Sequence, residues 1–386
     1  MSGRRRSSML VRLVAAASLA LMVAGCSPAA TATAIPQASV TGSPSIATSL
    51  VATPLVTTPP ATATSRPSIF GRPLITSIFT ADPAAHVFDN KLYVYVSHDL
   101  DHNNASTQNG DQYDMEDYHV LSFADMDSLP ADLGQILNVK DVPWASKQMW
   151  APDAAFKNGT YYLYFPAKDK DGIFRIGVAT SGSPAGPFVA QKDPIAGSFS
   201  IDPAVFVDDD GQAYMYFGGL WGGQLEKWQS GTYDPNGVEP GSGQNALGPR
   251  IAKLSADMSS FDGPVKGLAI VDEAGQPLSG DDHDRRYFEA PWVHKYKGTY
   301  YLSYSTGDTH NMAYATSDSA LGPFVFRGYV LPPVAGWTTH GSIVEFQGAW
   351  YLFYADNSLS GVDYKRCAKV VRLTYNADGT IPTIHP

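Results

Sequence analysis

A short pattern of apolar and aromatic residues recurs five times along the chain. Each copy has an apolar run, a turn that carries Asn, Asp or Gly, and a second run in which aromatic side chains alternate with aliphatic ones. Two such runs joined by a turn are typical of a β-hairpin. The five predicted hairpins are Asp82–Tyr95, Trp150–Phe165, Asp202–Phe217, Glu289–Tyr304 and His340–Tyr354.

The spacing of these hairpins predicts the fold class. They start roughly 50 to 90 residues apart, which leaves room for four strands and their loops in each repeat. We find no convincing amphipathic helix beyond residue 70, because Gly, Pro, Asn and Asp interrupt the apolar runs. Two similar segments, Ser181–Phe188 and Ser317–Phe324, follow their hairpins at a similar distance and suggest the same outer turn. We therefore predict an all-β domain over residues 70–386, built as a β-propeller.

The N-terminal residues 1–26 have the pattern of a signal peptide. Arg4, Arg5 and Arg6 precede the apolar run Met9–Val23, which is short for a membrane span. The run ends in Val-Ala-Gly-Cys at Cys26, which resembles the bacterial lipobox, where the cysteine is acylated. We expect an exported cell-surface lipoprotein that touches the membrane only through this lipid, with ordinary secretion as the alternative.

Residues 27–69 differ in composition from the rest of the chain. They consist largely of Ala, Thr, Ser and Pro, with almost no charge. Such a segment buries too little apolar surface to offset the entropy of ordering, so we expect a disordered tether. Acylation of Cys26 would leave Cys367 as the only free cysteine, and therefore without a disulfide partner.

Composition narrows the classes of ligand. The formal net charge is −10 and the pI is about 5.3, which argues against a nucleic-acid partner because phosphate binding needs clustered Lys and Arg. Aromatic residues make up 12% of the chain. Most suit packing within sheets, and a minority in a cleft would suit stacking on sugar rings. An oligosaccharide is thus a better candidate ligand than a nucleic acid.

The first residues of the hairpins carry the candidate chemistry. Four of the five hairpins open on an acid or a histidine: Asp82, Asp202, Glu289 and His340. Any single acid there is explained by turn capping. Equivalent positions of successive blades face one channel, however, so these four side chains are expected to converge. Acids packed together raise one another's proton affinity, which allows separate acid and base roles.

Five short stretches of the sequence resemble the motifs of a known enzyme family. They are Phe79–Pro83 (FTADP), Met149–Asp153 (MWAPD), Ser200–Ala204 (SIDPA), Phe288–Trp292 (FEAPW) and His340–Ser342 (HGS). With them, the chain resembles glycoside hydrolase family 43 from about Pro73 to the C-terminus. The resemblance implies a five-bladed propeller with three acids in the channel mouth. Val142–Ile176 and Ser305–His310 resemble the branch with β-xylosidases and α-L-arabinofuranosidases.

The resemblance also implies a role for each acid. Asp82 would be the general base that activates water, and Glu289 the general acid that protonates the leaving oxygen. Asp202 would orient Glu289 and keep its pKa high. Attack by water opposite the leaving group would invert the anomeric centre.

Further site residues come from the same resemblance. His340 would help hold a hydrated metal, usually Ca²⁺, although Ca²⁺ prefers oxygen ligands and a plain hydrogen-bonded histidine is the alternative. Arg366 would lie near the base, although Cys367 after it departs from the family's usual Ser or Asn. Trp150, Arg366, Asp153 and Trp292 are expected to bind substrate, with core packing as the alternative for Trp150. No organic cofactor is expected.

These expectations favour an exo-acting, inverting pentosidase that releases xylose or arabinose. An α-L-arabinofuranosidase or an endo-arabinanase, whose cleft would be open, is the enzymatic alternative. Fructan-cleaving relatives are disfavoured because Thr80–Ala84 (TADPA) lacks their Asn-Asp-Pro-Asn-Gly-type motif. A non-catalytic glycan-binding surface lipoprotein is the alternative of another class, and it would not need all three acids.

Overall fold

The computed structural model describes residues 68–337 and 340–386, all within the unit Thr64–Pro386. The predicted signal peptide, Cys26 and almost the whole predicted tether lie outside the described residues. No helix in the part of the chain that the structure describes is long and apolar enough to cross a membrane. The helices found there are three short 3₁₀ turns: η1 (Val139–Asp141), η2 (Trp221–Gly223) and η3 (Leu225–Trp228).

All five predicted hairpins are present as antiparallel strand pairs. Each pair supplies the first two strands of a separate sheet, which we call blades 1 to 5 in chain order. The pairs are β1 (Phe79–Phe88) with β2 (Lys91–Asp99), β5 (Asp153–Lys157) with β6 (Thr160–Lys168), β9 (Ala204–Val207) with β10 (Ala213–Phe217), β14 (Glu289–Tyr296) with β15 (Thr299–Ser305), and β18 (Gly341–Phe346) with β19 (Ala349–Asp356).

The outer strands complete the blades. They are β3 (Asp117–Phe123) and β4 (Ala131–Asn138) in blade 1, β7 (Phe174–Ser181) and β8 (Val189–Ala190) in blade 2, β11 (Arg250–Lys253) and β12 (Lys266–Gly267) in blade 3, β16 (Met312–Ser317) and β17 (Phe324–Leu331) in blade 4, and β20 (Cys367–Leu373) in blade 5. A short strand, β13 (Ile270–Val271), adds to blade 4 parallel to β17. The two similar segments Ser181–Phe188 and Ser317–Phe324 both connect a third strand to a fourth, as predicted.

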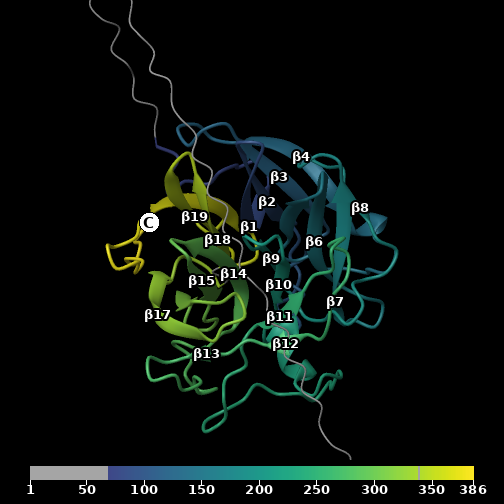
Figure 1. Cartoon of the computed structure of the whole chain (residues 1–386). Coiled ribbons are helices and arrows are strands. Elements are labelled where there is room, and N and C mark those ends of the chain that lie inside the picture. The colour runs from purple at the N-terminus through teal and green to yellow at the C-terminus, as the bar shows by residue number, and fades with distance from the viewer. Residues whose placement is uncertain (1–67, 338–339) are drawn as a thin grey trace, which may run out of the picture. The chain divides into compact units, whose positions relative to one another are not determined.

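The first strands of the blades form the inner wall of a ring. Strand β1 contacts β5, β5 contacts β9, β9 contacts β14, β14 contacts β18, and β18 returns to β1 (Figure 1). This closed order is a five-bladed β-propeller, and it confirms the predicted fold class.

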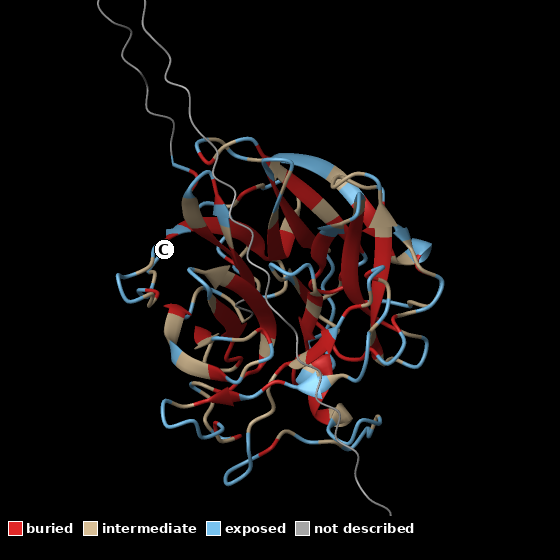
Figure 2. Cartoon of the chain, viewed as in Figure 1, coloured by how far each residue is buried: buried red, intermediate tan, exposed pale blue. Residues whose placement is uncertain are grey.

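The core lies between the blades. Alternating side chains of neighbouring sheets pack face to face; for example, Val94 and Leu121 of blade 1 share a cluster with Phe353 and Val370 of blade 5. Buried residues follow the strands, whereas exposed residues lie mainly in the connecting loops (Figure 2). The period of two along each strand explains why both faces of a blade are buried.

Blade 5 differs from the expected four strands. It has three strands of its own, and residues 69–74 lie along the outer one. The Gly71 N–H donates to the Val370 carbonyl and the Leu74 N–H to the Ala368 carbonyl, each at 2.9 Å. The start of the domain therefore satisfies the edge of the last blade, which would otherwise present unpaired backbone groups.

Candidate active site

The first residues of the five hairpins line one cavity of about 280 Å³. Asp82, Trp150, Asp202, Glu289 and His340 come from five different blades, or from the segments that lead into them, yet they face the same space. The ring symmetry brings these chain-distant residues together, as the hairpin pattern predicted.

Irregular backbone aims the acids at this space. The pairing of β1 with β2 shifts register between Ala81 and Ala84, and Asp82 within the shift has a φ of 52°. Asp202 has a φ of 57°. In blade 4 the register shifts after Glu289, where Ala290 has a φ of 59°. Positive φ is unfavourable for residues other than glycine, and such strain concentrates at functional sites, where a bulge redirects a side chain.

A buried arginine fixes the orientation of Asp82. The Nη1 of Arg366 donates to Asp82 Oδ1 at 2.9 Å, and the Ser97 hydroxyl donates to Asp82 Oδ2 at 2.6 Å. Arg366 also binds Asp99, with Nε at 2.9 Å from Oδ2 and Nη2 at 2.8 Å from Oδ1. Burial disfavours the cation, but the two carboxylates outweigh it and raise the pKa of Arg366. Asp82 is therefore held in one geometry beside a permanent positive charge.

Glu289 has the properties of a group that holds a proton near neutral pH. Burial raises the pKa of Glu289 to about 7; the negative charge of Asp82 acts in the same direction, and Arg366 opposes it. A carboxyl group with this pKa can donate a proton in the pH range where ordinary carboxyl groups are ionised.

Asp202 connects to the acid through the backbone. Its Oδ2 accepts from the N–H of Ala290, the residue after Glu289, at 2.9 Å. Burial raises the pKa of Asp202 well above its usual value, and the charges of Glu289 and Asp82 add to that rise. The repulsion between Asp202 and Glu289 means that the two carboxyl groups resist being ionised at the same time. This geometry fits an orienting residue.

His340 lies close to Asp202, with Nδ1 at 3.8 Å from Oδ2. Burial lowers the pKa of His340, while Asp82 partly opposes this effect. A neutral imidazole is the form that binds metals. A different group of metal-ligating side chains lies in blade 1, where His98, Asp117 and His119 present ligand atoms within 4.8 Å of one another.

Trp150 lines the cavity and also packs tightly. Its indole N–H donates to the Tyr113 carbonyl at 2.9 Å, and its ring centroid lies 4.8 Å from that of Phe174. One face of Trp150 is therefore a wall of the cavity, held by its neighbours.

Asp153 and Trp292 require a correction, because neither lines this cavity. The carboxylate of Asp153 binds His86 Nε2 of blade 1 at 2.6 Å and accepts from the Val205 N–H of blade 3 at 2.5 Å. The indole N–H of Trp292 donates to the Ile343 carbonyl of blade 5 at 2.9 Å. Both residues tie neighbouring blades together, so we no longer assign them to substrate binding.

Several cavity residues were not identified from the sequence. The aromatic ones are Tyr113, Trp221, Phe288 and Trp337. Trp221 stands in a glycine-rich segment, Gly218–Gly223 (GGLWGG), which was the available signal. Asp99, the second partner of Arg366, ends a tyrosine-rich strand and carried no signal.

A fixed carboxylate and a carboxyl group of raised pKa share one cavity at the axis of a five-bladed propeller, an arrangement that fits the acid and base of a glycoside hydrolase. The family model of "Glycosyl hydrolases family 43" matches residues 70–381, and the chain belongs to this family.

Relatives with known names are similar over nearly their whole length. The chain is 59% identical to "Xylosidase/arabinosidase 43A" of Humicola insolens, covering 81% of this chain and 99% of that protein. It is 50% identical to "Xylosidase/arabinosidase" of Bacteroides ovatus, covering 81% and 97%. A solved β-xylosidase/α-arabinofuranosidase from a compost microbial metagenome, in complex with xylotriose and in a calcium-free form, is 60% identical. The match covers 82% of this chain and 97% of the solved chain, and its TM-score is 0.80.

Proposed function

We propose that this glycoside hydrolase is an exo-acting, inverting enzyme that releases xylose, arabinose or both from xylo-oligosaccharides or arabinoxylan fragments. The observation that carries the proposal is the contrast between two acids of one cavity. Asp82 is fixed by Arg366, whereas the pKa of Glu289 is raised to about 7. The names of the similar xylosidase/arabinosidases support the substrate class.

The acids divide the reaction between them. Asp82 takes a proton from a water molecule, and the water oxygen attacks the anomeric carbon. Glu289 donates its proton to the glycosidic oxygen, so the leaving sugar departs as an alcohol while the anomeric centre inverts. Trp150 offers an apolar surface to the sugar ring.

Replacing the acid tests this assignment. In Glu289→Gln, hydrolysis of xylobiose is expected to fall by about 10²–10⁴-fold, because general acid catalysis is worth that much, while the fold is retained. Glu345→Gln is the matched control, since Glu345 is exposed on β18. Unchanged xylobiose hydrolysis in Glu289→Gln would remove Glu289 from the acid role.

The products distinguish the remaining alternatives. Proton NMR of the first-formed sugar is expected to show the inverted anomer, and a retained anomer would rule out water activation by Asp82. A panel of 4-nitrophenyl glycosides, xylo-oligosaccharides and arabino-oligosaccharides separates xylosidase, arabinofuranosidase and endo-arabinanase activities. Binding of these oligosaccharides without turnover would favour the glycan-binding lipoprotein instead.

We also propose a hydrated Ca²⁺ beside His340. The chemistry fits because the imidazole is neutral, Asp202 is a neighbouring oxygen donor, and the cavity admits water for the rest of the shell. Bound Ca²⁺ would supply positive charge at the axis. Calcium titration of chelator-treated protein is expected to raise Tm in wild type and in His119→Ala, but not in His340→Ala. A rise that depends on His119 would place the ion in blade 1 instead.

Attachment through Cys26 remains a proposal, because it rests on the lipobox pattern alone. In bacterial cells, the wild-type protein is expected in the membrane fraction and Cys26→Ser in the soluble fraction. Equal distribution of the two proteins would contradict lipid anchoring and leave ordinary secretion.

A further inference from the structure

One long loop of blade 1 forms a wall of the active-site cavity. Residues 100–116 connect β2 to β3, and we call them the blade-1 loop. They supply Thr107, Gln108, Gly110, Gln112, Tyr113 and Met115 to the cavity lining. The position of this loop therefore affects the shape of the space that receives substrate.

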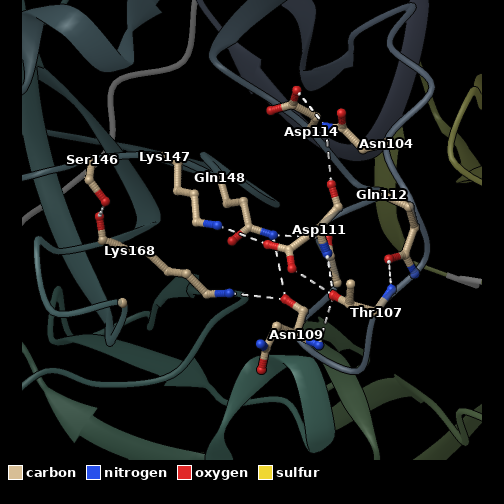
Figure 3. Close-up of polar contacts among 12 residues, drawn as sticks. Asn104, Thr107, Asn109, Asp111, Gln112, Asp114, Ser146, Lys147, Gln148 and Lys168 are labelled. Atoms are coloured by element: carbon tan, nitrogen blue, oxygen red, sulfur yellow. Dashed lines mark hydrogen bonds and ion pairs between the residues drawn. The ribbon is translucent and has the colours of Figure 1, made fainter.

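The blade-1 loop is held by side chains of blade 2 and the segment before it (Figure 3). The Lys168 amine donates to the Asn109 carbonyl and the Gln148 amide to the Gly110 carbonyl, both at 2.9 Å. Lys147 forms an ion pair with Asp111 at 2.8 Å. The first two contacts are to backbone carbonyls, so they fix the path of the loop whatever its side chains are.

Lys168 is an unusual residue for this task. It is 3% exposed and, among the described residues, it forms no ion pair with a carboxylate. Its amine lies 5.0 Å from the centroid of the Phe174 ring. Burial lowers the pKa of Lys168 to about 8, with Lys147 acting in the same direction, Asp111 opposing, and Lys227 adding a small lowering. A buried cation whose partner is a neutral carbonyl stabilises the fold poorly, which points to a role in holding the loop.

The held loop closes against two neighbours. A Cβ placed on Gly110, where φ is 72°, would lie 2.5 Å from Cη2 of Trp150. A Cβ on Gly222, in η2 between β10 and β11 of blade 3, would lie 3.4 Å from that same atom and 3.7 Å from the Gln108 carbonyl oxygen. At Gly110 the loop thus meets the indole with no room for a further side chain, and η2 approaches the same indole and the loop at van der Waals distance.

The seam that carries the blade-1 loop and Trp150 lies across the ring from the acid. In a ring of five blades, the seam between blades 1 and 2 faces blade 4, which carries Glu289. Glu289 must reach the glycosidic oxygen, so the leaving part of the glycan extends on the blade 4 side. The blade-1 loop therefore stands behind the sugar that is cut off.

We propose that the blade-1 loop, held by Lys168 as a positioning residue, closes the pocket behind the terminal sugar and restricts the enzyme to removing one sugar at a time. This inference rests on the proposed function and names the residues that would make the enzyme exo-acting. Without the clamp, the loop would move from Trp150 and let a longer glycan pass through the cavity.

The test compares the first products that the purified full chain releases from xylohexaose. Lys168→Met keeps the aliphatic stem but removes the donor to Asn109, and Gly110→Ala displaces the same wall from the Trp150 side. Lys170→Met is the matched control, because Lys170 is exposed just beyond β6. Thermal unfolding of each variant confirms that it is folded.

We expect both wall variants to release xylobiose and xylotriose early, whereas wild type and Lys170→Met release xylose alone. The KM for xylobiose is expected to rise about ten-fold with kcat nearly unchanged, because the lost wall contact holds substrate and transition state alike. Folded wall variants that release only xylose with the wild-type KM would overturn the inference. A wild-type protein inactive on both xylo-oligosaccharides and arabinoxylan fragments would instead overturn the proposed function.

Discussion

At the scale of single residues, the site gives different properties to carboxyl groups that share one cavity. Asp82 is bound by a guanidinium and a hydroxyl, whereas Glu289 is desolvated and lies near the negative charge of Asp82. The repeat pattern placed both acids at equivalent positions and the family resemblance assigned their roles, but the contacts that produce this contrast were not predicted. Local environment decides which acid holds the proton.

The raised pKa of Glu289 predicts the alkaline limb of the pH–rate profile. The acid is active when protonated, so kcat/KM for xylobiose is expected to fall as pH rises through about 7. A substrate with an excellent leaving group, such as 2,4-dinitrophenyl xyloside, needs no proton and should lose this limb. A limb that persists with the activated substrate would belong to a different group.

Arg366 is predicted to stabilise the folded protein as well as to orient Asp82. Arg366→Met leaves the buried carboxylates of Asp82 and Asp99 without their cation, so the free energy of unfolding is expected to fall by about 3–5 kcal/mol. Arg372→Met, at an exposed position of the same strand, should cost less than about 1 kcal/mol. Urea unfolding measures both, and equal losses would contradict a special role for the buried pair.

At the scale of elements, the inner strand of each blade presents its functional residue at one end. His340 directly precedes β18, and Gly341 begins that strand where the carbonyl of Phe353 in β19 passes close by. A Cβ at position 341 would overlap this backbone oxygen. The absence of a side chain therefore sets how closely β18 pairs with β19, and hence where His340 stands.

Gly341→Ala is accordingly expected to lower the free energy of unfolding by about 3 kcal/mol and to reduce activity. Gly182→Ala is the control, because Gly182 is exposed and a Cβ there would meet nothing within 4 Å. Thermal unfolding and xylobiose hydrolysis provide the two measurements. If Gly341→Ala changed neither thermal unfolding nor xylobiose hydrolysis, β18 would be able to shift without affecting His340 at the channel axis.

At the scale of the whole molecule, the ring depends on its closure. Residues 69–74 pair with β20, and the side chains of Ile69 and Leu74 are buried in the cluster between blades 1 and 5. The two ends of the domain are thus joined by backbone bonds and apolar burial, although they are about 300 residues apart in sequence.

Removing this closing segment is expected to destabilise the propeller. A chain that begins at Thr76 loses two buried aliphatic side chains, so its free energy of unfolding should fall by about 3–6 kcal/mol relative to a chain that begins at Ser68. Denaturant unfolding of the two chains gives the comparison. Equal stabilities would show that blade 5 holds its edge without the segment.

The sequence by itself determined the repeating unit and the position of its chemistry. Hairpins depend on short-range alternation and on turn residues, so all five were predictable, and with them the convergence of Asp82, Asp202, Glu289 and His340. The resemblance of five short motifs supplied the family, which the family model confirmed.

Only the tertiary structure decided which side chains meet across blades. The contact of Arg366 with Asp99 spans 267 positions, and the blade-1 loop reaches Lys168 from another sheet. It also moved Asp153 and Trp292 from substrate binding to the seams between blades. Such pairings depend on how the closed ring orients each strand and loop. The local periodicity of the sequence does not predict contacts that form only when the ring closes.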